Sequence, residues 1–103
     1  MSTSPDPAAG VFGISVAAEM VGTGVQNLRA YERAGLLEPH RTPGGTRLYS
    51  ADDIQRLRRI AALLDAGLNL SGVAMVLDLE LQNALLRDEI ADHRRRKAKA
   101  DGT

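Results

Sequence analysis

The side chains best suited to chemistry in this sequence are arginines, and they are concentrated in residues 26–60. This segment carries seven basic groups against four acidic ones, although the chain as a whole has a net charge of zero. Residues 61–93 are acidic, and residues 94–103 carry five basic groups against one acid. A guanidinium group is a planar fork of N–H donors that fits a phosphate or the edge of guanine. The charge distribution would therefore orient the basic segment toward a polyanion.

The sequence lacks the residues that catalysis or metal binding would require. The chain has no cysteine, and its two histidines, His40 and His93, are too isolated to suggest a metal site. The adjacent acids at residues 52–53 are explained by the positive end of a helix dipole, without a catalytic carboxylate pair. The glycines at residues 44–45 suit a turn, because no phosphate-loop lysine follows them. We expect no enzyme, no cofactor and no metal.

Size and composition favour one small helical domain. The chain has 103 residues, of which 44% are hydrophobic and only 3% aromatic, so an aliphatic core is expected. Its apolar runs are too short for a membrane span, and its start does not resemble a secretory signal. We therefore expect a soluble, cytoplasmic protein.

Two short helices joined by a tight turn are predicted near the start, after a disordered leader over residues 1–11. Ser15 is expected to cap a helix over residues 16–21, which Gly22 ends. Thr23 and Gln26 have the spacing of a capping box for the next helix, over residues 25–34. This arrangement predicts a helix-turn-helix.

A small hairpin and a third helix follow. Residues 42–46 read Thr-Pro-Gly-Gly-Thr, a turn sequence, and the flanking residues 39–41 and 47–49 are long enough for two short strands, which would form a wing. Ser50 is expected to cap the next helix, which Gly67 ends. The predicted core is aliphatic and comprises Val16, Met20, Leu28, Ile54, Leu57, Ile60 and Val76.

The last predicted helix is capped by Ser71 and either breaks near Asp78 or continues. No proline or glycine interrupts residues 73–101. Past Ile90 the apolar stripe ends, so we expect fraying and then a disordered basic tail over residues 94–103. This tail could solubilise the end of the chain, bind DNA non-specifically or engage an acidic partner. Four side chains at 4-3-4 spacing form a stripe for a partner helix: Leu79, Asn83, Leu86 and Ile90.

Three blocks of the sequence, residues 14–18, 24–37 and 41–50, closely resemble the DNA-binding domain of the MerR family. The resemblance covers about residues 13–79, and within the family the Arg-Thr-Pro-Gly-Gly block is most similar to the HspR heat-shock repressor branch. It implies a mainly α, winged helix-turn-helix domain over residues 12–79, followed by a C-terminal dimerisation or partner helix over residues 80–93.

The resemblance also implies which residues contact DNA. Residues 25–34 would be the recognition helix in the major groove, with Arg29 as its principal contact. Ala30 stands where family members often have an aromatic residue, so that contact is not carried over. The expected DNA-binding residues are Thr23, Gln26, Asn27 and Arg29 on the helix side, and Arg41, Thr46, Arg47 and Tyr49 in the wing.

Structural interpretations of these side chains stand beside the functional ones. Arg29 and Arg33 could pair with Glu32 and other surface acids on a solvated helix face. Tyr49 could donate its hydroxyl to a phosphate, or it could pack its ring against Leu57.

The function implied by the resemblance is that of a transcriptional repressor that binds double-stranded DNA as a homodimer on an inverted repeat. The alternative is a protein-interaction module without DNA function. Residues 72–90 also resemble part of the CbpM chaperone modulators, which share a MerR-like fold and bind a co-chaperone. Retention on heparin or random duplex DNA would separate the two hypotheses.

Overall fold

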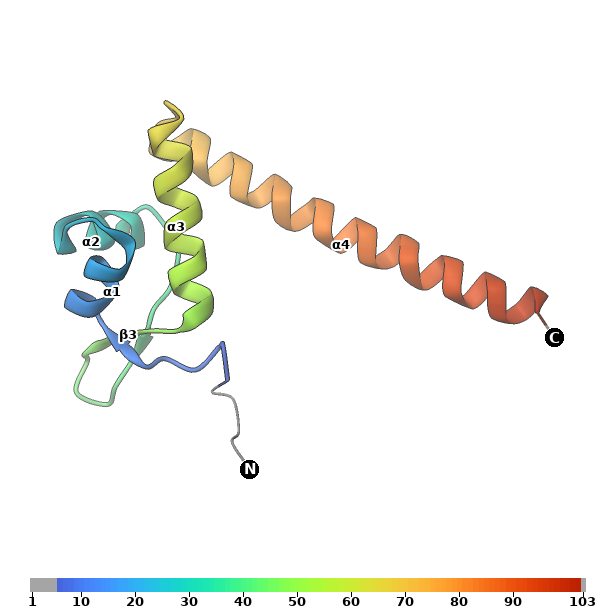
Figure 1. Cartoon of the computed structure of the whole chain (residues 1–103), viewed down its shortest axis with the longest axis horizontal. Helices are drawn as coiled ribbons and strands as arrows, with labels where there is room; N and C mark the ends of the chain where they lie inside the picture. Colours follow the sequence, from blue (N-terminus) through green and yellow to red (C-terminus); the bar gives the residue numbers. More distant parts are fainter. Residues whose placement is uncertain (1–5, 103) are drawn as a thin grey trace. The chain divides into compact units, whose positions relative to one another are not determined.

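The computed structural model describes residues 6–102 of the chain. These residues fold into two compact units, one ending at Val73 and the other beginning at Ala74. The elements, in chain order, are β1 (Phe12–Gly13), α1 (Ile14–Val21), α2 (Val25–Arg33), β2 (His40–Arg41), β3 (Arg47–Tyr49), α3 (Ala51–Asp65) and α4 (Leu70–Asp101) (Figure 1). The predicted class, a mainly helical winged helix-turn-helix, is confirmed.

Helices α1 and α2 form the helix-turn-helix, and Gly22 ends the first of them. Gly22 has a φ of 80°, a left-handed conformation that glycine adopts without strain. The side-chain caps predicted at Ser15 and Thr23 are wrong, because the N-caps are Gly13 and Gly24 and neither makes a side-chain cap hydrogen bond. Strand β1 leads directly into α1, so that helix begins before the predicted serine.

Strands β2 and β3 form the predicted hairpin, and β1 adds a third strand that was not predicted. The order is β1-β3-β2 with antiparallel pairing throughout. The turn is closed by Thr42, whose amide donates to the Thr46 carbonyl at 2.9 Å. The Thr42 hydroxyl oxygen accepts from the Thr46 amide at 3.1 Å. A strand of two residues has too short a pattern of alternation to be recognised in the sequence.

The expected disordered leader, residues 1–11, lies partly outside the described residues, which begin at residue 6. In the described part, the Asp52 amide donates to the Pro7 carbonyl at 3.0 Å, and the Val11 amide donates to the Tyr49 carbonyl at 3.0 Å. Residues 6–11 are thus attached to β3 and to the start of α3, where disorder was expected.

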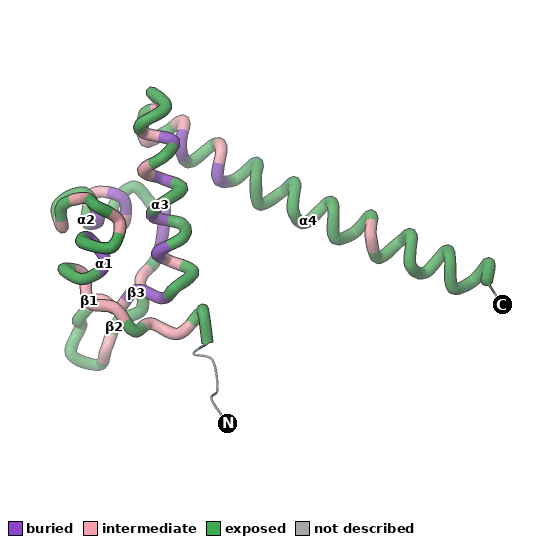
Figure 2. The backbone as a smooth tube through the Cα atoms, in the orientation of Figure 1, coloured by how far each residue is buried: buried purple, intermediate pink, exposed green. Residues whose placement is uncertain are grey.

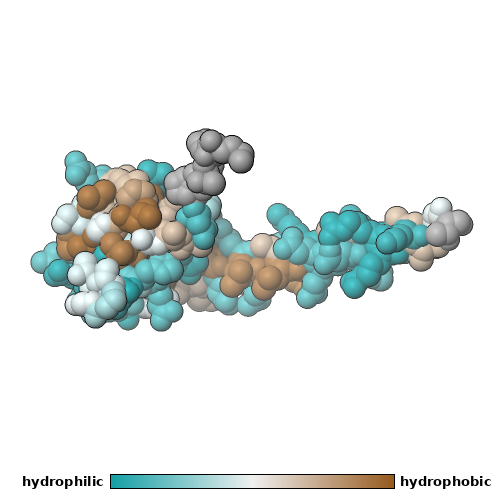
Figure 3. Space-filling model, turned by 90° about the horizontal axis from the view of Figure 1, so that it is seen from below, coloured by the Kyte–Doolittle hydropathy of each residue, from teal (hydrophilic) through white to brown (hydrophobic). Residues whose placement is uncertain are grey.

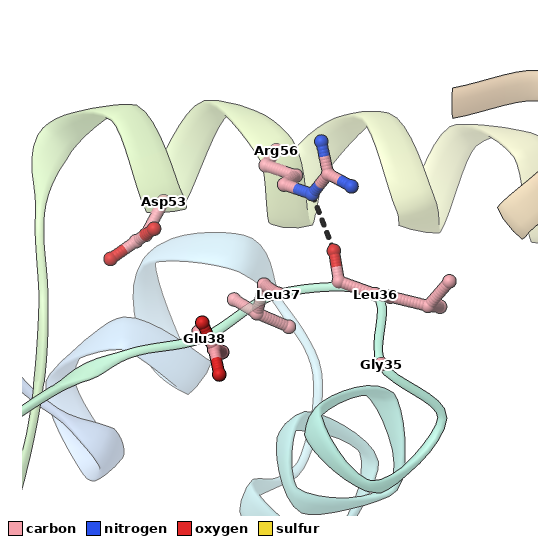
Figure 4. A pocket seen from close by; sticks show the side chains of 6 residues that line it. All are labelled: Gly35, Leu36, Leu37, Glu38, Asp53 and Arg56. Atoms are coloured by element: carbon pink, nitrogen blue, oxygen red, sulfur yellow. Dashed lines mark hydrogen bonds between the residues drawn. The ribbon is translucent and has the colours of Figure 1, made fainter. Parts of the chain in front are cut away.

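Helix α3 begins with the predicted serine cap. The Ser50 hydroxyl oxygen accepts from the Asp53 amide at 3.0 Å, and the Asp53 carboxylate accepts from the Ser50 amide at 2.9 Å. One turn later, Arg56 donates to the carbonyl of Leu36 across a surface hollow of about 390 Å³ (Figure 4). This bond ties α3 to the loop that follows α2 and so helps to hold the first unit together.

The core of the first unit lies between the helices and β3. Figure 2 shows buried segments along α1, α2, α3 and β3. Val16 and Met20 were predicted to be core residues, and this is wrong, since they are 50% and 39% exposed. Helix α1 packs against α2 and α3 through small side chains, which allow close approach. The buried apolar residues of the first unit are Ala17, Ala18, Leu28, Tyr31, Leu36, Leu37, Tyr49, Ile54, Leu57, Ile60, Leu63 and Val73.

Helix α4 is continuous, so the possible break near Asp78 does not occur. Its cap is Asn69, which accepts from the Gly72 amide at 2.8 Å, and the prediction of Ser71 is wrong. The helix continues to Asp101, through residues for which disorder was expected, because no proline or glycine interrupts it. Val76, predicted to be core, is half-buried. Figure 3 shows apolar side chains in the first half of α4 and hydrophilic ones in its second half.

Candidate nucleic-acid interface

Helix α2 has one buried side and one side that carries hydrogen-bonding groups. Leu28 and Tyr31 are buried in the core. Gln26, Asn27 and Arg29 are exposed on the first turns of the helix. Arg29 makes no hydrogen bond or ion pair with any residue in the described part of the chain, so its guanidinium is available for an external acceptor.

Thr23 and Asn27 are joined to each other at the entrance to α2. The Asn27 side-chain amide donates to the Thr23 hydroxyl oxygen at 2.7 Å. This bond orients the Asn27 amide and leaves one of its two N–H groups and its carbonyl oxygen for other partners.

The alternative in which Arg29 and Arg33 pair with Glu32 is wrong, because Glu32 pairs with the wing. Arg41 Nη2 lies 2.6 Å from Glu32 Oε1, and Arg47 Nε lies 2.5 Å from Glu32 Oε2. Each oxygen of one carboxylate therefore binds a different strand of the hairpin. The structure thereby joins the two wing arginines to α2 through Glu32.

The environment of Glu32 favours its charged form. Burial by itself would raise the pKa of this carboxyl group, but the hydrogen bond and charge of Arg47, followed by those of Arg41, outweigh burial. The pKa of Glu32 consequently lies below its ordinary value of 4.5.

This lowered pKa predicts a loss of stability in acid. The contribution of Glu32 to the free energy of unfolding is fully present above pH 4.5 and is lost as the pH falls through the lowered pKa of the folded state. Chemical unfolding at a series of pH values should show wild type more stable than Glu32→Gln near neutrality, with the difference shrinking in that acidic window. A difference that stays constant on acidification would contradict the assignment of the pKa shift to Glu32.

The remaining wing residues occupy different environments. Thr46 is exposed in the turn. Tyr49 has no exposed surface, and its hydroxyl finds no hydrogen-bond partner among the described residues. Burial raises the pKa of Tyr49, and the nearby charge of Glu32 raises it further. Of the two interpretations of Tyr49 made from the sequence, burial favours the packing role, since an enclosed hydroxyl cannot reach a phosphate.

Sequence reasoning did not identify Glu32 as part of this candidate interface. The signal was present in the wing, because Arg41 and Arg47 flank the turn symmetrically and pair across the hairpin. Two like charges directly opposite each other need a counter-ion. The sequence does not show which element of the fold supplies that counter-ion.

The stripe predicted for a partner helix lies on α4 in the second unit. Leu79, Leu86 and Ile90 are 59%, 56% and 50% exposed, and Asn83 is exposed between them. Leu81 and Leu85 are equally exposed on another side of the same helix, since successive residues differ by about 100°. The second unit therefore has two separate apolar surfaces.

Residues 6–102 lack the features of two further classes of site. None of the helices there is long and apolar enough to cross a membrane. Within the same residues, no three histidine, aspartate or glutamate side chains gather as a set of metal ligands.

A helix-turn-helix with a cationic hairpin wing fixed beside its second helix defines the class of winged helix-turn-helix regulators. The model of the family described as MerR HTH family regulatory proteins matches residues 12–80. The chain belongs to the MerR family, which consists of transcriptional regulators and is not a family of enzymes. The resemblance stated from the sequence is confirmed.

Two curated relatives illustrate the match. The chain is 46% identical over 83 residues to the heat shock protein HspR of Streptomyces coelicolor, covering 80% of this chain and 55% of that protein. It is 37% identical over 67 residues to the regulator GlnR of Bacillus anthracis, covering 65% of this chain and 52% of that protein. The chain thus spans about half the length of the curated relatives that it matches.

Among solved structures, the chain is similar to HiNmlR, a MerR family regulator that lacks the sensor domain and is bound to promoter DNA. The TM-score is 0.59 at 25% identity, over 89% of this chain and 91% of that one.

Proposed function

We propose that this chain represses transcription in the cytoplasm by binding an inverted-repeat operator as a homodimer. The observation that carries the proposal is the pair of contacts by which Glu32 joins two wing arginines to α2, the helix that also carries exposed donors. The similarity to HiNmlR, which was solved on promoter DNA, and to HspR supports it.

Helix α2 and the wing have different roles in the proposal. Helix α2 lies in the major groove, where Arg29, Gln26 and Asn27 contact base edges and Thr23 orients Asn27. The wing lies on the sugar-phosphate backbone, where Arg41 and Arg47 contact phosphates and the exposed Thr46 adds a hydroxyl donor. The helix provides sequence discrimination, and the wing provides affinity.

Dimerisation is assigned to the stripe on α4. Large exposed aliphatic side chains tend to be covered by another surface, and a two-fold helix pair covers the same stripe on both partners. Asn83 within that stripe would cost stability but specify the register of the pair. The dimer would then present two recognition helices to half-sites about 34–36 Å apart, or a multiple of that distance.

The direct test is a footprint and a gel shift with the DNA upstream of the gene's own operon. A protected inverted repeat is expected, together with reduced transcription from that promoter in a purified system. Protection accompanied by increased transcription would keep the DNA-binding role and overturn repression.

The wing assignment predicts a change in salt dependence. In the double variant Arg41→Gln, Arg47→Gln, binding to operator and to random duplex should both weaken, because every duplex carries the phosphates that the wing contacts. The slope of log affinity against log salt should become shallower by about two units, one for each lost phosphate contact. Salt titrations with both DNAs measure this.

The control for this variant addresses Glu32, which loses both of its partners. A triple variant that also carries Glu32→Gln removes the unpaired carboxylate and should show the same shallow slope. If affinity fell for the operator alone and the slope were unchanged, the wing would contact bases, and the division of roles would be wrong.

The second candidate function, a protein-interaction module similar to CbpM, is favoured by the exposed apolar side chains of α4. It requires that the unmodified chain shows no retention on heparin or random duplex DNA at low salt. A co-chaperone is the partner to test in that case.

A further inference from the structure

In the wing, at the point where β2 pairs with β3, two positive charges are arranged in a way that is unfavourable by itself. Arg41 and Arg47 stand directly opposite each other across β2 and β3. Like charges at such positions destabilise an antiparallel pair, since the side chains lie on the same face a few ångströms apart. The hairpin therefore needs an anion at this point.

Glu32 supplies that anion from the recognition helix. The carboxylate binds one arginine with each oxygen, and its side chain is only 18% exposed, against 47% for Arg41 and 28% for Arg47. Partial burial reduces screening by water and salt, so this pair of contacts is stronger than an ordinary surface ion pair. The contacts also cross between elements, since Glu32 is nine residues from Arg41 and fifteen from Arg47.

The contacts leave most of the donor capacity of Arg47 unused. The Arg47 side chain binds Glu32 through Nε and makes no other hydrogen bond within residues 6–102, so its two terminal amino groups remain open to an acceptor. Arg41 is held at two points, because its Nη1 also donates to the Gly45 carbonyl at 3.2 Å. One carboxylate thus orients two guanidinium groups and neutralises only one of their two charges.

We propose that Glu32 is a positioning residue for DNA recognition, which holds the two wing arginines in a fixed register with Arg29 on the same helix. Phosphate contacts from the wing then align the recognition helix along the major groove. This inference rests on the proposed DNA-binding function. Glu32 itself touches no DNA and acts through the arginines.

The test compares Glu32→Gln with wild type on operator and on random duplex at the same salt. Glutamine is of nearly equal size and leaves both arginines charged, so affinity for random DNA should be maintained or increase. Operator affinity should fall, so that the ratio of operator to random affinity decreases by about tenfold or more.

Two further variants separate positioning from simple charge. Glu38→Gln removes one negative charge from the exposed loop before the wing, at a residue without a hydrogen bond or ion pair in the described chain, and should leave the ratio unchanged. Glu32→Asp keeps the charge on a side chain one methylene shorter, and its ratio should lie between those of wild type and Glu32→Gln. The resonance of the Arg47 Nε–H group reports the contact without DNA, and it should shift in Glu32→Gln while the circular dichroism spectrum stays native.

The outcomes are distinct. If operator and random affinity rose equally in Glu32→Gln and in Glu38→Gln, Glu32 would act only by repelling DNA through its charge. That result would overturn the inference. An unchanged ratio in Glu32→Gln, with DNA binding by wild type intact, would overturn the inference alone. No DNA binding by the unmodified chain would overturn the proposed function and this inference with it.

Discussion

Arg29→Ala is expected to abolish specific operator binding while leaving the fold intact. The side chain is exposed on α2 and has no partner within the described chain, so its removal leaves no cavity and no unpaired group. A bidentate contact to a base is worth about 1–3 kcal/mol, so loss at both half-sites of a dimer lowers operator affinity by about 30-fold to 10⁴-fold. Fluorescence anisotropy with labelled operator measures the effect, and circular dichroism checks the fold.

The matched control for this variant is Arg33→Ala, which removes the same charge one helical turn further along α2. It should weaken binding to operator and to random DNA by the same factor, because the proposal gives Arg33 no base contact. Operator affinity unchanged in Arg29→Ala, with a native spectrum, would contradict the assignment of α2 as the recognition helix.

Leu86→Asp combined with Ile90→Asp is expected to produce a folded monomer. Two carboxylates at the last two positions of the stripe would have to be buried without partners in a helix pair, which is strongly unfavourable. Because two linked half-site contacts bind far more tightly than one, affinity for the inverted repeat should fall by about 100-fold or more. Weak affinity for random DNA should remain. Sedimentation with and without operator measures the assembly.

The control for the dimer prediction lies on the same helix. Leu81→Asp combined with Leu85→Asp introduces the same charges at side chains of similar exposure, 57% and 55%, on another side of α4. This variant should remain a dimer on the operator. If the unmodified chain is a monomer even on its operator, the stripe has another occupant, and a protein partner becomes the better explanation of α4.

Much of this fold was determined locally, and those parts were predictable from the sequence. Ser50 and Asp53 form their reciprocal cap from residues three apart, and the Thr-Pro-Gly-Gly-Thr turn lies within a single loop. Helical spacing of Leu28, Ile54 and Leu57 identified core positions because periodicity records which face of a helix is buried. The match to the MerR family follows from these local patterns, since three short blocks in the right order specify the helices and the wing.

Other features were decided only when distant segments met. Whether α1 buries Val16 or Ala17 depends on how closely α2 and α3 approach it, and the close packing selected the smaller residue. Strand β1 forms because its two residues pair with the free edge of β3. A pattern of two residues is too short to predict that pairing from the sequence.

The candidate site shows the same division between local and tertiary information. The sequence by itself determined that Arg41 and Arg47 lie on either side of one turn, because the length of the turn sets the register of a hairpin. Only the tertiary structure decided that Glu32 binds both arginines. An ion pair requires two atoms to come within about 4 Å, and that separation depends on where the fold places α2 relative to the hairpin rather than on any spacing along the chain.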